Sequence, residues 1–395
     1  MTTAPTAPPA TTDLQIPFAD CWITEQAQAA AQRVLASGWV TTGAECNLFE
    51  EEFASYVRAD HAVAVSSCTV AIELALRSLR LDPGAAVLTS TMTFCGAVHA
   101  IEHAGLRPVL VDVDPTTGMP TPTTVARAVR SLDGRPAAMV LVHWAGDTFD
   151  REALAAAAGL PAERVVEDAA HALGAEHRGE VVGSGPTVCF SFYATKNLPI
   201  GEGGMVTTDD PERAAWMRRA RLHGMSHDAW RRYLPGGTWR YDVVEPGLKA
   251  NLTDLQAALG RAQLQSLSTW QARRARIAAL YDLRLADLPT VQRPHRAHAS
   301  TGRHAWHLYA VQLSDATVRD EVAEALARRG IGTSVHFIPV HRLTHFSSLL
   351  PPDGLPGADR MFDRLLSLPL YPRLTTHQVD DITASLADAL EGVER

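Results

Sequence analysis

The chain has 395 residues, a hydrophobic content of 46% and a formal net charge of −8 at pH 7. This length suggests two domains, or one large domain with an appendage, and the apolar content suffices for a large core. The acidic balance argues against nucleic acid as the main partner, and no apolar run is long enough to cross a membrane. Five scattered cysteines without CxxC spacing predict reduced thiols in a cytoplasmic protein.

The first segment, residues 1–13, is rich in Pro, Ala and Thr and lacks the basic and apolar regions of a signal peptide, so we expect a disordered tail. From about Asp60, short apolar runs alternate with helical patterns such as residues 150–159. Strands are expected at residues 61–65, 85–90, 109–113, 138–142, 165–167 and 188–192. This alternation predicts an α/β fold with three αβα layers and a mostly parallel sheet, which binds ligands at the carboxyl ends of its strands.

The alternation of strands and helices fades after about Met205. Residues 247–285 predict a long helical region, and residues 318–330 predict a further helix. We therefore expect a large domain over residues 14–271 and a smaller α+β domain over residues 272–395. The sixteen histidines are dispersed and do not form a ligand set by their spacing, so no metal site is predicted.

Lysine is nearly absent from this chain. Of 36 basic Lys and Arg residues, only Lys196 and Lys249 are lysines. Genomic bias toward arginine is one explanation. The other is chemical: arginine stays protonated, whereas a lysine amine with a lowered pKa forms Schiff bases and transfers protons. Because small residues and glycines surround Lys196 within residues 190–204, we favour the chemical explanation.

Three other strand ends carry residues that suit the same chemistry. Small residues at 66–69 lead directly into a helix, which is either an ordinary cap or a phosphate site. Asp168 ends an apolar strand with His171 three residues later, and is either a helix cap or a buried carboxylate that holds a ring nitrogen protonated. Phe94 is either a core residue or an aromatic plate. Together with the lysine, these residues fit pyridoxal 5'-phosphate (PLP).

With these motifs the chain resembles the DegT/DnrJ/EryC1/StrS family of PLP-dependent sugar aminotransferases, from about Ile16 to the C-terminus. The matching segments include FEEEFASY, VAVSSCTVAIELAL, VLTSTMTFCG, VVEDAAHALGAEHRG, FSFYATKNLPIGEGGMVTT, GLKANLTDLQAALGRAQL and SLPLYPRLT. The resemblance implies the aspartate aminotransferase type I fold and PLP as the cofactor. Lys196 matches the lysine that forms the Schiff base and then moves a proton. Asp168 matches the partner of the pyridine nitrogen, His171 a residue beside the ring, and Phe94 the aromatic residue stacked on it.

The resemblance also implies the phosphate contacts. Thr69 and Ser191 match residues that bind the phosphate, and Cys68 stands where the family usually has glycine, which is tolerable if the backbone there is not left-handed. Asn251 matches an asparagine that reaches the phosphate from the other subunit. A homodimer with shared active sites is therefore expected. The loop with Asp147 and Thr148 also departs from the family pattern and bears on substrate choice.

The implied reaction moves an amino group from L-glutamate or L-glutamine to a ketone of a nucleotide-activated deoxysugar. Residues 332–342 most resemble members that aminate C4, which makes His336 and His341 candidate substrate contacts, although packing histidines are the alternative. Lys249 either reaches the substrate's phosphates or is exposed.

Three alternative functions remain from the sequence. The same machinery can aminate C3 of the sugar or a cyclitol ketone. A PLP dehydratase of this family carries histidine in place of the lysine, so Lys196 argues against it. The third alternative is a non-catalytic, regulatory PLP-binding protein. Such a protein does not need the lysine, the aspartate and the aromatic residue together, and this chain retains all three. The Arg- and Ala-rich composition, together with family habit, suggests antibiotic or glycan sugars.

Overall fold

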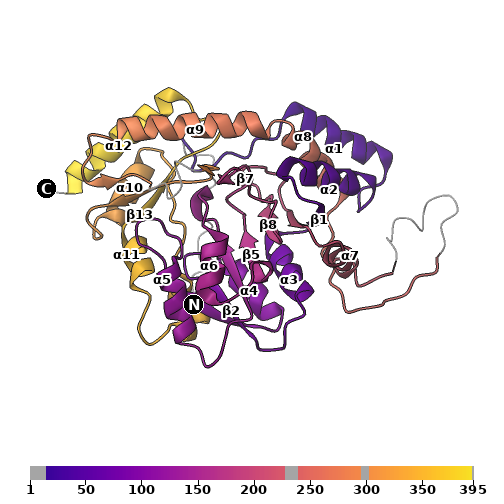
Figure 1. Ribbon diagram of the computed structural model, residues 1–395. Helices are drawn as coiled ribbons and strands as arrows, with labels where there is room; N and C mark the ends of the chain where they lie inside the picture. Colours follow the sequence, from indigo (N-terminus) through magenta and orange to yellow (C-terminus); the bar gives the residue numbers. More distant parts are fainter. Residues whose placement is uncertain (1–14, 227–238, 295–301, 394–395) are drawn as a thin grey trace, which may run out of the picture.

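A computed structural model describes residues 15–226, 239–294 and 302–393 (Figure 1), and the predicted disordered tail lies outside them. Its main feature is a seven-stranded sheet in the order β1-β9-β8-β5-β4-β2-β3. The strands are β1 (His61–Val65), β2 (Ala86–Ser90), β3 (Arg107–Val111), β4 (Ala138–Val142), β5 (Val165–Asp168), β8 (Val188–Ser191) and β9 (Gly204–Thr208). β9 is antiparallel to both neighbours, whereas the other adjacent strands are parallel. The prediction of a mostly parallel sheet is confirmed.

Helices cover both faces of this sheet. Successive strand residues point to opposite faces, and because they are apolar on both faces, each face must be buried. In β1, Ala62 and Ala64 join the core beneath α2, whereas Val63 and Val65 join the core beneath α3 and α7. The covering helices are α2 (Ala44–Val57), α3 (Cys68–Ser78), α4 (Cys95–His103), α5 (Pro122–Arg130), α6 (Arg151–Ala158), α7 (Pro211–Ala220) and α8 (Asp254–Leu264). Runs that are apolar at every position are therefore buried on both faces, which confirms the three-layer αβα arrangement.

A smaller α+β part follows (Figure 1). Its sheet is antiparallel, with the strand order β10-β12-β13. Its elements are α9 (Leu267–Arg284), β10 (Val291–Gln292), β12 (Tyr309–Leu313), α10 (Arg319–Arg328), α11 (Pro356–Arg364), β13 (Leu365–Leu368) and α12 (Thr376–Val393). Ile16 also belongs to the core of this part, through a parallel bridge with Ile331. The predicted boundary after residue 271 falls inside α9, and the division into domains stays a prediction.

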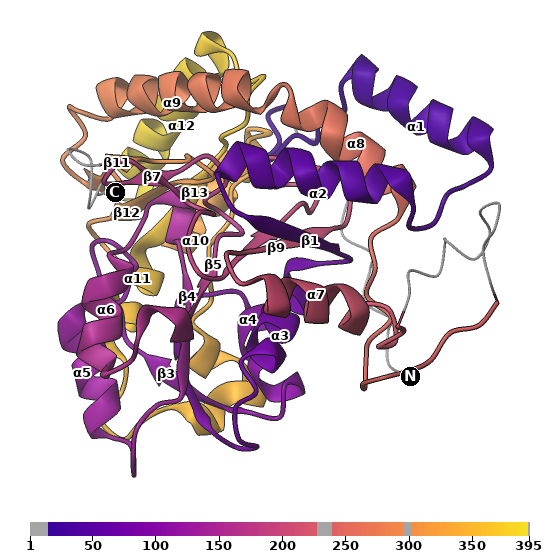
Figure 2. The same ribbon diagram turned by 45° about the vertical axis from the view of Figure 1, so that its right-hand side comes forward.

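The first helices pack on α8 at one end of the main sheet (Figure 2). α1 (Glu25–Ser37) lies against α8, as does α2. A third, small sheet pairs β11 (Gly302–Arg303) with β6 (Glu176–His177) and β7 (Glu180–Val181). None of the helices in the described part of the chain combines the length and apolarity that a membrane span needs.

The structure differs from the sequence-based expectation in two places near the site. β9 was not predicted, because its sequence GMVTT lies just where the alternation of strands and helices ends. The predicted helical region over residues 247–285 is helical only from α8 onward. A capping box of Thr253 and Gln256 fixes the start of α8, and the residues before it are extended.

Candidate active site

A cavity of about 510 Å³ lies at the carboxyl ends of the parallel strands, where an α/β sheet binds its ligands. The structure brings eight of the predicted site residues into its lining: Cys68, Thr69, Phe94, Asp168, His171, Ser191, Lys196 and His336. They follow the ends of β1, β2, β5 and β8, and His336 comes from the smaller part of the chain. Residues far apart in sequence thus meet because parallel strands end at the same edge.

Lys196 lies in the turn after β8, and its backbone N–H donates to the Tyr193 carbonyl at 2.9 Å. Burial in the cavity lowers the pKa of its amine from 10.5 to about 8, although the charge of Asp168 partly opposes this change. A pKa near 8 leaves an appreciable neutral fraction at physiological pH, and the neutral amine is the nucleophilic form. The environment of Lys196 therefore suits Schiff-base chemistry, which an arginine in its place could not perform.

Asp168, the last residue of β5, presents a buried carboxylate to the same cavity. Burial raises its pKa, while the backbone N–H of Ala170 and the charge of Lys196 act in the opposite direction. Oδ1 accepts from Ala170 N–H at 3.0 Å and from the Cys68 thiol at 3.7 Å, so Oδ2 is available to an incoming donor. A buried carboxylate of this kind is stabilised by a charged N–H donor, and the protonated pyridine nitrogen of PLP is such a donor.

The start of α3 forms a cup for an anion. The Ser67 side chain caps this helix by accepting from Val70 N–H at 3.3 Å, and the amides of Cys68 and Thr69 at the first turn have no acceptor within the helix. Gly204 of β9 lies against this turn, and a Cβ there would approach the Ser67 carbonyl carbon to 2.5 Å. Helix starts with free amides bind phosphate, and the glycine lets β9 pack against the cup.

Cys68 fits this cup despite the family's usual glycine. It is the first residue of α3, and its backbone is not left-handed, so a side chain is accommodated without strain. Ser191, at the end of β8, lies in the same lining, and its hydroxyl accepts from Tyr193 N–H at 3.4 Å. The helix start and these hydroxyl and thiol side chains together suit the phosphate of PLP.

Two buried histidines complete the cavity wall. Nδ1 of His171 accepts from Ala145 N–H at 3.3 Å, which leaves the proton on Nε2. Nδ1 of His307 lies 3.0 Å from Asn197 Oδ1. The Nδ2 group of Asn197 donates to the Ala305 carbonyl, so the atom that faces His307 is the amide oxygen, which accepts. His307 therefore carries its proton on Nδ1 and keeps a lone pair on Nε2. Burial holds the pKa of both rings well below the usual value, and both are neutral.

His307 was not predicted from the sequence. Its ring lies 4.3 Å from that of His171, between centroids, and it lines the cavity. His307 falls within the smaller domain predicted over residues 272–395, and nothing in a lone histidine before a strand indicates a site. Asn197, next to the catalytic lysine candidate, could have suggested a partner for this ring but not which of the sixteen histidines.

Aromatic side chains line the mouth of the cavity. Phe94 caps α4 and is 60% exposed, which is unusual for phenylalanine and leaves a ring face available for stacking. Phe337 lies 6.1 Å from Phe94 and stacks on His171 at 5.6 Å, between ring centroids. Phe337 was not predicted either. An exposed aromatic ring in the same cavity lining as Lys196 is consistent with the expected stacking on the cofactor ring.

His336 is held firmly at the edge of the cavity. Its ring stacks on Phe18 at 5.2 Å, and Nδ1 lies 3.1 Å from the Ser367 hydroxyl. Burial lowers the pKa of His336 to about 4, so the ring is neutral at physiological pH. Its place in the lining is consistent with the expected substrate contact.

The remaining predicted residues lie elsewhere in the described part of the chain. His341 is buried, with Nδ1 2.8 Å from the Thr91 hydroxyl and Nε2 3.1 Å from the Asp359 carboxylate. Both ring nitrogens are thus engaged outside the cavity lining, and a contact of His341 with the substrate stays a prediction. Lys249 is exposed and donates to Asn251 Oδ1, so this lysine too lies outside the lining of its own chain.

Asn251 lies beside the end of β1, where it pairs with Val65 in an antiparallel bridge, and its amide donates to the Thr42 hydroxyl at 2.6 Å. It does not line the cavity of its own chain. Its expected contact with the phosphate in the other subunit stays a prediction.

The lysine of lowered pKa, the buried carboxylate and the phosphate cup at the carboxyl edge of this sheet define a PLP-dependent enzyme with the type I transferase fold. A profile of the DegT/DnrJ/EryC1/StrS aminotransferase family matches residues 22–387, and the chain belongs to this family. It is therefore a PLP-dependent aminotransferase.

Individual relatives are similar to this chain along nearly their whole length. The chain is 43% identical over 367 residues to the spore coat polysaccharide biosynthesis protein SpsC of Bacillus subtilis (strain 168), covering 91% of this chain and 93% of SpsC. The structure is similar to that of DesV from S. venezuelae in complex with a ketimine intermediate, with 35% identity, a TM-score of 0.84 and coverage of 94% and 98% of the two chains. It is also similar to the putative sugar aminotransferase Spr1654 from Streptococcus pneumoniae in its PMP form, with 29% identity, a TM-score of 0.88 and coverage of 96% and 100%.

Proposed function

We propose that this chain transfers an amino group from L-glutamate, or L-glutamine, to the C4 ketone of a nucleotide-activated deoxysugar. The observation that carries the proposal is the pairing, in one cavity, of the Lys196 amine with a pKa of about 8 and the buried Asp168 carboxylate. The sugar part of the proposal is supported by the similarity to Spr1654, titled a sugar aminotransferase, and to SpsC, named for polysaccharide biosynthesis. The C4 position is supported by the resemblance of residues 332–342 to C4-aminating members and by the place of His336 in the lining.

Several residues of the cavity have a task in this reaction. When bound, PLP supplies an electron sink for the C–H bond that is broken in the amino donor. The start of α3 and Ser191 would hold its phosphate, Asp168 would keep its ring nitrogen protonated, and Phe94 would stack on its ring. The neutral amine of Lys196, once free, takes a proton from one carbon atom and returns it to another. The neutral rings of His171 and His307 border this path without adding charge.

We further propose that two copies of the chain share their active sites. Asn251 lies outside its own cavity, although the resemblance assigns it to the cofactor phosphate. Nearby, the segment that precedes it exposes several large apolar side chains: Trp239, Tyr241, Val243 and Val244. Exposed apolar side chains that cluster in this way are typical of protein interfaces. In a dimer, a segment from one subunit can supply Asn251 to the cavity of the other.

The proposal is tested by absorbance spectroscopy of the purified holoenzyme. L-glutamate should bleach the band of the lysine-bound cofactor, and a TDP- or UDP-linked 4-keto-6-deoxyhexose should restore it. Bleaching without restoration would leave an aminotransferase with another acceptor, and the same assay with 3-keto sugars and cyclitol ketones would then identify it. No lysine-bound band after addition of PLP would refute the proposal.

The chain offers a matched control for this assay. Lys196→Arg keeps the positive charge but should lose both steps, whereas Lys249→Arg changes the exposed lysine and should retain them. A protein that binds PLP but shows neither step with any ketone would instead be regulatory.

A further inference from the structure

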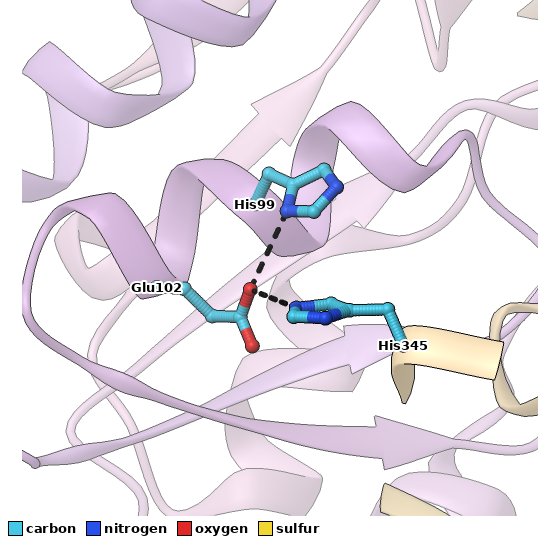
Figure 3. A group of neighbouring side chains, drawn as sticks. All are labelled: His99, Glu102 and His345. Atoms are coloured by element: carbon cyan, nitrogen blue, oxygen red, sulfur yellow. Dashed lines mark hydrogen bonds and ion pairs between the residues drawn. The ribbon is translucent and has the colours of Figure 1, made fainter. Parts of the chain in front are cut away.

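Two histidines and a glutamate meet outside the active-site cavity (Figure 3). His99 and Glu102 lie three residues apart on α4, so they share one face of the helix, and His345 comes from the 3₁₀ helix η6 (Thr344–Leu349). Glu102 Oε2 lies 3.4 Å from His99 Nδ1 and 3.3 Å from His345 Nε2. The ligand atoms of the three residues all lie within 4.8 Å of one another.

We propose that these three side chains form a binding site for a divalent transition metal, with Zn²⁺ as the expected ion. Zinc binds imidazole nitrogen and carboxylate oxygen at about 2.0–2.1 Å in a tetrahedron. In a regular tetrahedron of that size, adjacent ligand atoms are about 3.4 Å apart. The distances from Glu102 Oε2 to the two ring nitrogens match this separation. They also lie at the long end of the range of hydrogen bonds and ion pairs, which are the metal-free alternative, and exceed the roughly 2.7–2.9 Å of a strong charge-assisted hydrogen bond.

A buried aromatic side chain packs against both imidazoles. Phe346 is buried, and its ring lies 4.9 Å from that of His99 and 4.7 Å from that of His345. A rigid aromatic ring thus supports both imidazoles. Glu102 is only 34% exposed and His345 is 66% exposed, so an ion has access from solvent and water can occupy the fourth position.

His103 is the nearest further histidine on α4, but it is not part of the proposed ligand set. Its ring lies 5.9 Å from that of His99, and its Nδ1 is 3.8 Å from Glu73 Oε2. Spacing along the chain gave no hint of this site, because Glu102 and His345 are 243 positions apart.

The position of the site suggests what a bound ion would do. α4 begins directly after Phe94, and η6 follows the segment that holds Phe337, so the ligands join two elements that border the active-site cavity. A metal ion would fasten η6 to α4 and would stabilise the folded chain by binding to that state alone. It lies apart from the cavity lining, and transamination does not require it. The inference therefore stands independently of the proposed substrate.

The test is zinc titration of the tag-free, full-length holoenzyme after treatment with a chelator, followed by calorimetry. We expect one site per chain with a Kd on the order of 10 μM or tighter. Co²⁺ in the same site should show the visible absorbance of tetrahedral cobalt, which a hydrogen-bonded cluster without metal would not give.

Variants separate this site from adventitious zinc binding. Glu102→Gln and His345→Asn should each weaken zinc binding at least about tenfold and abolish the cobalt spectrum. His377→Asn is the matched control, because His377 is also an exposed histidine paired with a carboxylate, that of Asp381, on the distant α12. The cofactor absorbance band reports whether each variant is folded. Zinc affinity that is unchanged in both Glu102→Gln and His345→Asn, or an absence of binding at about 100 μM zinc, would overturn the proposal.

Discussion

The scarcity of lysine makes the electrostatics of the cavity directly measurable. Burial lowers the pKa of Lys196 from 10.5 to about 8, while the nearby carboxylate of Asp168 favours the charged amine and limits the change. At about 1.36 kcal/mol per pKa unit, the net effect of burial and of the opposing attraction to Asp168 disfavours the charged amine by roughly 3.4 kcal/mol in the cofactor-free chain. Replacing Asp168 with Asn removes the attraction but keeps the shape, so the pKa of Lys196 should fall further, by roughly one unit or more.

The assay is NMR titration of cofactor-free protein whose amines carry ¹³C-methyl groups from reductive methylation. Only Lys196, Lys249 and the N-terminal amine contribute signals, so assignment needs one substitution, Lys249→Arg. The wild-type chain should show one lysine that titrates near pH 8, and Asp168→Asn should move that titration to lower pH. If Lys196 titrates near 10 in the wild type, or if its pKa stays the same in Asp168→Asn, then the explanation of its reactivity by burial and a single carboxylate is wrong.

Three further predictions concern stability, the phosphate cup and the unpredicted histidine. Because the pKa of Lys196 is lower in the folded chain, the buried charge destabilises the fold fully below pH 8, and this cost disappears between pH 8 and 10.5. Lys196→Met should therefore raise the free energy of unfolding of the cofactor-free chain at pH 7 by up to about 3 kcal/mol. Urea titrations should show a much smaller increase at pH 10.5. Gly204→Ala should weaken PLP binding at least about tenfold in fluorescence titrations, because the added Cβ would lie 2.5 Å from the Ser67 carbonyl carbon. Gly392→Ala is the control, because Gly392 has open space around it and its substitution should leave PLP binding unchanged. Equal affinities of the two variants would refute the close packing of the cup. His307→Asn removes a neutral ring that borders the path of the proton transferred by Lys196. It should lower kcat at least about tenfold while PLP affinity changes less than about threefold. A loss of PLP affinity alone would show that the ring only supports the fold.

Much of the fold could be read from the sequence because the central strands are buried on both faces. The expected strands at residues 61–65 and 138–142 coincide with β1 and β4, since each is a continuous apolar run between turns. β9 escaped prediction because it has no helix before it and returns antiparallel within the sheet, next to a glycine-rich turn. Local patterns report burial and periodicity, but not which strand inserts between two others.

The candidate site shows the same limit. Lys196 and Asp168 could be predicted because a rare amine and a carboxylate each follow an apolar strand, and the rule for strand ends then places them together. His307 and Phe337 reach the cavity from the smaller part of the chain, whose packing on the sheet no local pattern encodes. His341 has the same residue type and lies five positions after His336, yet Thr91 and Asp359 engage both of its nitrogens elsewhere.

The parallel bridge between Ile16 and Ile331 has a consequence for the order of events during synthesis. Ile16 N–H donates to the Gly330 carbonyl at 3.0 Å, and Gly332 N–H donates to the Ile16 carbonyl at 2.9 Å. Phe18, two residues later, lines the cavity and stacks on His336. The wall that contains Phe18 can therefore close only after residues 330–337 have left the ribosome. A nascent chain shorter than this contains Ile16 but lacks Ile331, its partner in the bridge, so the complete cavity arises only in the last stage of translation.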